Sequence, residues 1–187
     1  MERLLLHICC APCATHAFEV LRERFEVTGY AYNPNIHPEE EYARRLGAVR
    51  QWAERVGLAV LEGPYEPEAW FRATEGMESE PEGGARCEMC YRMRLERTAG
   101  VAGREGFGHL ATTLTMGPSK RAEVVNRIGR EVAAGHGLVF LEADFKKRGG
   151  FQRSLELSRA FGLYRQNYCG CRYSLRQPRR ATDRSNG

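Results

Sequence analysis

The feature that most constrains the fold is a regular alternation of short apolar runs with longer helical patterns. We interpret the apolar runs as strands, at residues 4–8, 27–32, 58–61, 109–115 and 138–142. We interpret the periodic segments as helices, at residues 14–24, 39–56, 87–101, 120–134 and 151–161, with Ser119 as the predicted N-cap of the fourth. Alternating strands and helices predict an α/β fold with a mainly parallel sheet that helices cover on both faces.

The length of 187 residues suits one domain with one core. We expect a single α/β domain over residues 1–175 and a basic, flexible tail over residues 176–187. Five arginines crowd the last sixteen residues: Arg172, Arg176, Arg179, Arg180 and Arg184. Such a tail is typical of a phosphate-binding segment and equally of a solvated terminus. The net charge of +4, from 28 basic and 24 acidic residues, permits nucleic-acid binding without demanding it.

Neither a membrane span nor a secretory signal is expected. No apolar run approaches the roughly 18 residues that a membrane span needs, and the short run at residues 4–6 is followed by no small-residue cleavage site. We therefore expect a cytoplasmic protein. Residues 76–85 combine glycine, proline and acidic residues with little apolar content, which predicts a mobile loop.

Seven cysteines occur in three tight groups. They are Cys9, Cys10 and Cys13, then Cys87 and Cys90, then Cys169 and Cys171. An odd number of cysteines without an export signal argues against a secreted disulfide framework. Clustered thiols in a reducing compartment indicate metal binding or redox chemistry instead.

The first group contains a C-x-x-C pair, Cys10 and Cys13, next to Cys9. Such a pair is typical of a redox dithiol, of half a structural zinc site, or of packed thiols. The third thiol favours a metal centre, because a cation compensates the charge of crowded thiolates. The second C-x-x-C pair, Cys87 and Cys90, opens a predicted helix. The long separation of the two pairs fits a compact zinc ribbon poorly, so an iron–sulfur cubane and a zinc ion both stay open.

The third group is Cys169-Gly170-Cys171. A disulfide across so short a ring is strained and easily reduced, which favours a two-electron relay, although a pair of metal ligands is the alternative. Three segments lie at the carboxyl ends of predicted strands: residues 9–13, residues 112–119 and Asp144. In parallel sheets, ligands bind at this edge. We therefore expect these segments to meet at one rim.

Six strings of the sequence, in order, resemble the epoxyqueuosine reductase family QueH. They are HICCAPC (7–13), YNPNIHP (32–38), RCEMCYRMRL (86–95), TTL (112–114), DFKK (144–147) and YRQNYCGCRYS (164–174). The resemblance covers residues 4 to about 175. The segment after the TTL string departs from the family pattern. Gly117-Pro118-Ser119-Lys120 stands where a Ser-Pro-aromatic sequence is expected.

The resemblance implies an iron–sulfur oxidoreductase acting on tRNA. The family deoxygenates epoxyqueuosine at the wobble position of tRNA with a GUN anticodon, giving queuosine without cobalamin. The fold it implies is a nucleotide-alpha-hydrolase-like (HUP/PP-loop-like) layer with helical additions, in which the cysteine loop replaces the phosphate loop. The electron donor is not identified by the sequence.

The resemblance also assigns roles to the cysteines. It implies a 4Fe-4S cluster held by Cys9, Cys10, Cys87 and Cys90. Cys13 then lies beside the cluster, either holding an additional iron ion, which we favour, or as a spare thiol. Cys169 and Cys171 match the redox pair of the family.

Polar residues near these groups supply the remaining candidates. Asp144 is a candidate to protonate the epoxide oxygen or to ligate iron, and a turn-capping aspartate is the alternative. Tyr32, Asn33 and Asn35 are candidates to bind the base or the cyclopentane diol, and turn formation explains the asparagines nearly as well.

Basic and aromatic candidates have similar alternatives. Lys146 and its neighbour Lys147 could meet tRNA phosphates or lie solvated on the surface. Arg165 and Arg172 flank the redox pair and could lower thiol pKa values or hold a phosphate. His7 is expected to be a hydrogen-bonded core histidine and not a ligand. Tyr91 and Tyr168 are candidates to stack on an unpaired base, and packing beside the cluster is the alternative.

Two competing functions follow from the same residues. A zinc-stabilised tRNA-binding module would use the cysteines without redox chemistry. An ATP-using PP-loop enzyme would need a run of open backbone donors after the first strand, which Cys-Cys-Ala-Pro-Cys cannot supply.

Overall fold

The computed structural model describes residues 1–175, and its centre is a five-stranded parallel sheet. The strands are β1 (Glu2–His7), β2 (Phe25–Ala31), β3 (Val60–Glu62), β4 (His109–Thr112) and β5 (Val139–Phe140), in the order β3-β2-β1-β4-β5. Every pair of neighbouring strands is parallel, with Leu6 of β1 opposite Gly29 of β2 and Ala111 of β4. The predicted α/β fold with a parallel sheet is confirmed.

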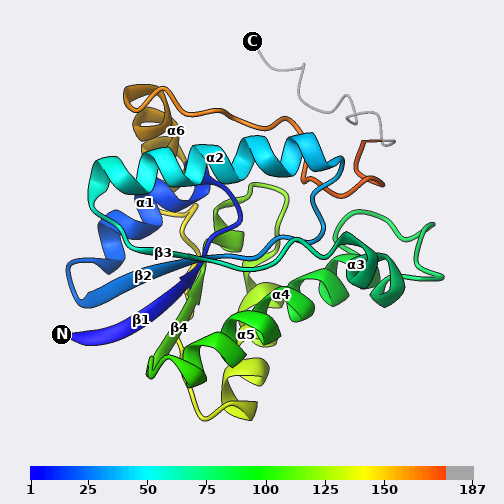
Figure 1. Ribbon diagram of the computed structural model, residues 1–187, viewed down its shortest axis with the longest axis horizontal. Coiled ribbons are helices and arrows are strands. Elements are labelled where there is room, and N and C mark those ends of the chain that lie inside the picture. Colours follow the sequence, from blue (N-terminus) through cyan, green and yellow to red (C-terminus); the bar gives the residue numbers. More distant parts are fainter. Residues whose placement is uncertain (176–187) are drawn as a thin grey trace.

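Helices cover both faces of the sheet, as predicted (Figure 1). They are α1 (Ala11–Leu21), α2 (Glu39–Val56), α3 (Pro67–Ala73), α4 (Ala85–Arg104), α5 (Ala122–Gly135), α6 (Gly150–Ala160) and the 3-10 helix η1 (Thr113–Met116). Helix α1 packs against α2 and α6 on one face, whereas α4 packs against α5 and α3 on the other.

The central strand β1 explains why its sequence is a continuous apolar run. Leu4 and Leu6 belong to the core between the sheet and α1, while Leu5 packs with Val101 and Phe107 on the opposite face. The three leucines are fully buried. A parallel strand buried on both faces cannot alternate polar and apolar residues, so β1 anchors the loop that follows it between two cores.

Two predictions about elements near the rim are wrong, and one helix was not predicted. Strand β4 ends at Thr112, because the Thr112 hydroxyl accepts a hydrogen bond from Leu114 N (3.2 Å) and starts η1. Helix α5 begins at Ala122 without a side-chain cap, and the Ser119 hydroxyl instead lies 3.2 Å from a carboxylate oxygen of Glu82. The seven-residue helix α3 was not expected.

The segment before α4 is irregular, as expected, and α4 itself holds it in place. The Arg86 guanidinium donates to the carbonyl oxygens of Met77 (2.9 Å), Glu78 (3.2 Å) and Glu80 (2.7 Å). Its mobility stays a prediction. The predicted basic tail, with Arg176, Arg179, Arg180 and Arg184, lies outside the described residues. Within residues 1–175, no helix has the length and apolar character to cross a membrane.

Candidate metal and redox site

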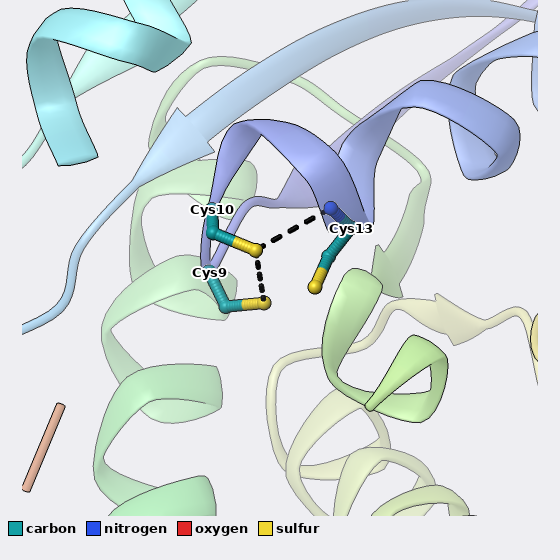
Figure 2. A group of neighbouring side chains, drawn as sticks. All are labelled: Cys9, Cys10 and Cys13. Atoms are coloured by element: carbon teal, nitrogen blue, oxygen red, sulfur yellow. Dashed lines mark hydrogen bonds between the residues drawn. The ribbon is translucent and has the colours of Figure 1, made fainter. Parts of the chain in front are cut away.

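The loop after β1 gathers three sulfur atoms. Cys10 is the N-cap of α1, and its Sγ accepts a hydrogen bond from Cys13 N at 3.3 Å. The Sγ atoms of Cys9 and Cys10 are 3.9 Å apart, and all three Sγ atoms lie within 4.8 Å of one another (Figure 2). Pro12 lies in the first turn, where its missing N–H costs no helical hydrogen bond. The turn from β1 into α1 therefore builds a compact group of thiols from local geometry.

The three thiols of this group have unequal acidity. Hydrogen bonds from the Cys10 and Cys13 thiols hold the pKa of Cys9 well below its usual value, although burial opposes this shift. Burial raises the pKa of Cys10 to about 12. Hydrogen bonds to Cys10 and Cys9, and then burial, raise the pKa of Cys13. A group in which one thiol is more acidic than its two neighbours can bind a soft cation and release its protons as it does so.

The second cysteine group lies at the start of α4. Gly83 N donates to Cys87 Sγ at 3.2 Å, and burial raises the pKa of the Cys87 thiol. Cys90 is buried and packs with Trp70. Among the described residues, the group whose sulfur atoms all lie within 4.8 Å contains Cys9, Cys10 and Cys13 but neither cysteine of α4. Cys9 and Cys87 pack against the same core cluster, and the predicted four-cysteine ligand set stays a prediction.

Arg94 connects the first two cysteine groups. Its guanidinium Nη1 lies 4.0 Å from Cys90 Sγ, and its Nη2 donates to Asn33 Oδ1 at 2.6 Å. Asn33 Nδ2 in turn donates to the carbonyl oxygen of Ile8 at 2.9 Å, directly before Cys9. Arg94 is almost fully buried, and its charge contributes to the lowered pKa of Cys9. The buried Arg94 cation therefore acts on sulfur atoms of both the first and the second cysteine group.

The third group lies in an irregular segment after α6. Arg45 of α2 donates to the carbonyl oxygens of Cys169 (3.0 Å) and Tyr168 (3.1 Å), and His37 N donates to the carbonyl oxygen of Gly170 (2.8 Å). Cys171 is buried against Trp70 and Cys90. These contacts bring the segment to the same rim as the other cysteines.

The two thiols of the third group also differ. Burial raises the pKa of Cys169, but the charges of Lys120 and Arg94 outweigh it and lower the pKa below its usual value. Burial raises the pKa of Cys171 to about 11. Both are free thiols in this structure, as are the five other cysteines, so the predicted redox disulfide stays a prediction.

A cavity of about 1120 Å³ opens between these groups. Cys9 and Cys13 line it from the loop after β1, and Cys169 lines it from the opposite segment. The predicted substrate-binding residues Asn35 and Arg165 also line it, as does Tyr168. The first and third cysteine groups therefore face one space, as expected for segments that follow the carboxyl ends of parallel strands.

Other predicted site residues lie outside this cavity lining. Tyr32 donates its hydroxyl to Glu66 (3.1 Å) and Asn33 is engaged in the backbone bond to Ile8. The Arg172 guanidinium lies 5.2 Å from the centre of the Phe71 ring. These side chains have structural partners that account for their positions.

The Asp144 region forms a small ion cluster. Lys146 Nζ lies 2.8 Å and Lys147 Nζ 3.7 Å from the Asp144 carboxylate. Lys146 Nζ also donates to the carbonyl oxygen of Lys120 at 3.1 Å. Lys146 thus links Asp144 to the backbone of Lys120, and its expected contact with tRNA stays a prediction.

His7 is a hydrogen-bonded core histidine, as predicted. Its Nδ1 lies 2.9 Å from Thr112 Oγ1, and its Nε2 lies 3.3 Å from the carbonyl oxygen of Tyr32. Burial lowers the pKa of His7 to about 3. A neutral imidazole between two neighbouring strands therefore fixes the strand ends on which the site is built.

Three residues of the site were missed from the sequence. Arg94 follows Cys90 by one helical turn, and this spacing was a usable signal because residues four apart share a helix face. Arg45 and Lys120 reach Cys169 across 124 and 49 residues of chain. Spacing alone carries no signal for contacts of that kind.

Comparison with known proteins gives a consistent family. The sequence model described as "Epoxyqueuosine reductase QueH" matches residues 4–177. The epoxyqueuosine reductase QueH of Streptococcus pyogenes serotype M1 is 40% identical over 179 residues, covering 92% of this chain and 70% of the relative. That of Haemophilus influenzae is 39% identical over 177 residues, covering 94% and 72%. That of Thermotoga maritima is 38% identical over 183 residues, covering 96% and 93%. The chain belongs to the epoxyqueuosine reductase QueH family.

Proposed function

We propose that this chain is an epoxyqueuosine reductase that removes the epoxide oxygen of epoxyqueuosine at the wobble position of tRNA. Its relatives carry this activity in their names. The observation in the fold that carries the proposal is that Cys9, Cys13 and Cys169 line the same cavity. The reaction converts an epoxide, two electrons and two protons into an alkene and water. A cavity that joins a thiol cluster to a second thiol pair suits such a two-electron reduction.

The donor set in the loop after β1 fits a thiolate-bound metal. Three sulfur atoms lie within 4.8 Å of one another, and one of them has a lowered pKa. We propose that Cys9, Cys10, Cys87 and Cys90 hold a 4Fe-4S cluster and that Cys13 faces an additional iron ion. When bound, the cluster supplies electrons singly. The buried cation of Arg94 beside Cys90 offsets the negative charge that four thiolates bring into a low-dielectric site.

The third cysteine group supplies electrons in pairs. Cys169 lines the cavity, while Cys171 lies behind it against Trp70. Oxidation of two thiols to a disulfide releases two electrons and two protons, the number that the epoxide consumes. We propose that the pair cycles between these states and that an external electron donor restores the thiols.

Substrate binding is assigned to the polar lining of the cavity. A volume of about 1120 Å³ exceeds the roughly 300–1,000 Å³ of typical ligand pockets, which leaves room for a nucleoside swung out of an RNA loop. Asn35 and Arg165 lie in this lining. We propose that they bind the modified base or its diol, and that Tyr168 stacks on it. Tyr32, Asn33, Arg172 and Lys146 would contact the tRNA only after giving up the structural partners described above.

Asp144 is the candidate for proton transfer. Its carboxylate is paired with Lys146, which also hydrogen-bonds the backbone of Lys120 at the rim. We propose that Asp144 either delivers a proton to the epoxide oxygen or ligates the additional iron. The fold that accompanies this site is proposed to be the nucleotide-alpha-hydrolase-like layer, and the proposed partner, tRNA with a GUN anticodon, makes the cytoplasm the proposed location.

A zinc-stabilised tRNA-binding module is the second candidate. The compact group of Cys9, Cys10 and Cys13 favours it as much as it favours iron, because three thiolates suit either metal. This module would have no use for the Cys169–Cys171 pair.

One experiment separates the two functions. Anaerobically purified, iron-loaded protein is incubated with tRNA that contains epoxyqueuosine and with a strong reductant, and the nucleosides are then analysed by mass spectrometry. We expect the modified nucleoside to lose one oxygen atom, and the Cys171→Ser variant to leave it unchanged. An unchanged nucleoside with iron-loaded protein contradicts the reductase. Full conversion by both Cys169→Ser and Cys171→Ser contradicts the role of the thiol pair.

A further inference from the structure

Lys120 has an unusual position for a lysine in a loop. It follows Pro118 and Ser119 between η1 and α5, and its ammonium group points inward. Lys120 Nζ lies 3.3 Å from Cys169 Sγ and 5.5 Å from the centre of the Tyr91 ring. The backbone of Lys120 is itself held, because its carbonyl oxygen accepts a hydrogen bond from Lys146 Nζ at 3.1 Å. The side chain of Lys120 therefore places its ammonium group against the sulfur atom of Cys169.

The two sulfur atoms of the third group meet different surroundings. Cys169 faces the cavity and the Lys120 ammonium. Cys171 is 9% exposed and packs with Trp70 and Cys90. In thiol–disulfide chemistry the thiolate is the reacting form, and a neighbouring ammonium stabilises it. The geometry therefore distinguishes two cysteines that the sequence alone leaves equivalent.

We propose that Lys120 is a positioning residue that selects Cys169, and not Cys171, as the reactive thiolate of the pair. This inference rests on the proposed function of the pair as a two-electron relay. Written with its balance, the Cys169 thiolate and the Cys171 thiol form the disulfide and release two electrons and one proton. The epoxide takes both electrons, and the second proton that water formation needs comes from solvent or a neighbouring acid. On reduction of the disulfide, Cys171 takes up the proton and Cys169 stays ionised beside Lys120.

Other charged and titratable groups also act on Cys169, and the test must separate their effect from that of Lys120. Arg94 of α4 acts in the same direction as Lys120, whereas Glu82 of the segment before α4 opposes both. Cys87 and Tyr91 of α4 also face this sulfur and would repel its charge if ionised. Lys120 is the cation that the structure places in hydrogen-bond contact with the Cys169 sulfur. Its removal should therefore have a larger effect than the loss of any charge on the nearby surface.

The test is the pH dependence of alkylation at each cysteine. Reduced, metal-loaded protein is treated with iodoacetamide under anaerobic conditions between about pH 5 and pH 9, spanning the range of shifted and ordinary thiols. Tandem mass spectrometry of the peptide that contains both cysteines distinguishes Cys169 from Cys171. We expect Cys169 to react first, with a midpoint below the ordinary value of about 8.5. Lys120→Met should raise this midpoint by at least about one pH unit and slow the reaction at pH 7 about tenfold.

Two variants serve as controls. Lys120→Arg keeps the cation and should keep the low midpoint. Arg121→Met removes one charge at the neighbouring position, where the side chain is exposed and paired with Glu123, and should leave the midpoint unchanged. If Lys120→Met does not fold by circular dichroism, Lys120→Gln replaces it. A midpoint that stays low in a folded Lys120→Met or Lys120→Gln variant overturns the proposal, as does a wild-type protein in which Cys171 reacts first.

The outcome is separable from that of the proposed function. Conversion of epoxyqueuosine is measured on the same wild-type preparation. If the wild type converts the nucleoside and the midpoint of Cys169 does not respond to Lys120, this inference alone fails. If the midpoint responds and no conversion occurs, the reductase assignment fails while the role of Lys120 at the sulfur stands.

Discussion

The loop after β1 and the segment after α6 both carry reactive cysteines, yet the fold positions them in opposite ways. In the first, Cys9, Cys10 and Cys13 are placed by the backbone that joins β1 to α1, and the sulfur of Cys10 caps the helix. In the second, Cys169 and Cys171 belong to no helix or strand. Arg45 of α2 and the backbone of His37 hold that segment from outside. One group is built locally, and the other is held by distant side chains.

This difference suits the two roles proposed for the groups. A metal site benefits from ligands fixed before the metal binds, and a strand between two cores provides such a support. A thiol pair that opens and closes a disulfide must change its geometry in each cycle. The segment after α6 has few regular hydrogen bonds of its own, so its position can be altered without disturbing the sheet. Substitutions should therefore affect one group and spare the other.

The largest expected effect separates metal binding from electron transfer. Cys10→Ser should remove bound iron and abolish activity, a loss beyond the roughly 10- to 100-fold that removing an outer-shell partner of a metal typically costs. Cys171→Ser should abolish turnover equally but keep the iron content and the visible absorption of the wild type. Iron analysis and nucleoside mass spectrometry on both variants check this. Loss of iron from Cys171→Ser would show instead that the third group ligates metal.

The next effect concerns the contact that holds the segment after α6. Arg45 and Glu41 form a buried ion pair at 2.7 Å, and Arg45 bonds two carbonyl oxygens of that segment. Within residues 1–175, Arg45→Met leaves the Tyr164 hydroxyl as the remaining hydrogen-bond partner of the Glu41 carboxylate. We expect the free energy of unfolding to fall by about 3 kcal/mol, the scale of a broken buried pair.

A matched variant on the same helix gives the reference for Arg45. Arg50 pairs with Glu62 on the surface and is 59% exposed, so Arg50→Met should change the free energy of unfolding far less than Arg45→Met. Urea unfolding measures both. Arg45→Met should also slow turnover while the iron content remains. Equal destabilisation by the two substitutions, or loss of iron from Arg45→Met, would contradict the division between the two groups.

The sequence predicts the locally built parts of the molecule well. The bounds of α2 agree with the predicted helix at both ends, and the order of strands and helices is confirmed apart from the short helix α3. The approach of Cys10 and Cys13 follows from a C-x-x-C pair at a helix start, whereas Cys9 is also held by Thr113, whose hydroxyl donates to Cys9 Sγ at 3.2 Å. Local propensity and spacing are sufficient for such features.

The parts that depend on tertiary contacts could not be predicted. Ser119 has the side chain of an N-cap, but the chain continues to Ala122 before α5 begins, and its hydroxyl is paired with Glu82. Asn33 has the composition of a turn residue, yet it joins Arg94 to the end of β1. Lys120 and Arg45 meet Cys169 only because the sheet brings their loops to one rim. These contacts depend on distances that the sequence does not encode locally.

A third prediction concerns the backbone of the redox segment. Gly170 has a φ of +112°, a backbone conformation that residues with a side chain rarely adopt. A Cβ atom at this position would lie 2.9 Å from Ile36 Cγ1 and 3.0 Å from Arg45 Nη1. Gly170→Ala should destabilise the protein by about 1–3 kcal/mol and slow formation of the Cys169–Cys171 disulfide.

The control for Gly170 is a glycine with space around it. Gly47 lies inside α2, and a Cβ atom there would meet nothing within 4 Å. Gly47→Ala should therefore stabilise the protein by about 0.5–1 kcal/mol. Thermal unfolding and the rate of disulfide formation measure both variants. A neutral Gly170→Ala would mean that the segment relaxes freely and is not held by Arg45 and Ile36.

The smallest expected effect is a pH dependence at His37, whose backbone anchors Gly170. Burial, and then the charge of Arg172, lowers the pKa of His37 to about 4, while Glu68 opposes the shift. In the unfolded chain the pKa is about 6.5, so between these values the unfolded state binds the proton first and stability falls as the pH falls. From pH 7 to pH 5 this should cost at most about 2 kcal/mol, with almost no contribution above pH 7.

His37→Gln isolates this effect from that of His7, whose lowered pKa acts in the same direction. The variant keeps the backbone N–H that donates to the Gly170 carbonyl oxygen. Its free energy of unfolding at pH 5 can therefore be compared with its own value at pH 7. Its loss of stability between pH 7 and pH 5 should be smaller than that of the wild type, because one group that must stay neutral in the folded state is gone. If the two proteins lose stability in parallel, His37 is not a neutral buried group and the segment has no acid-sensitive anchor.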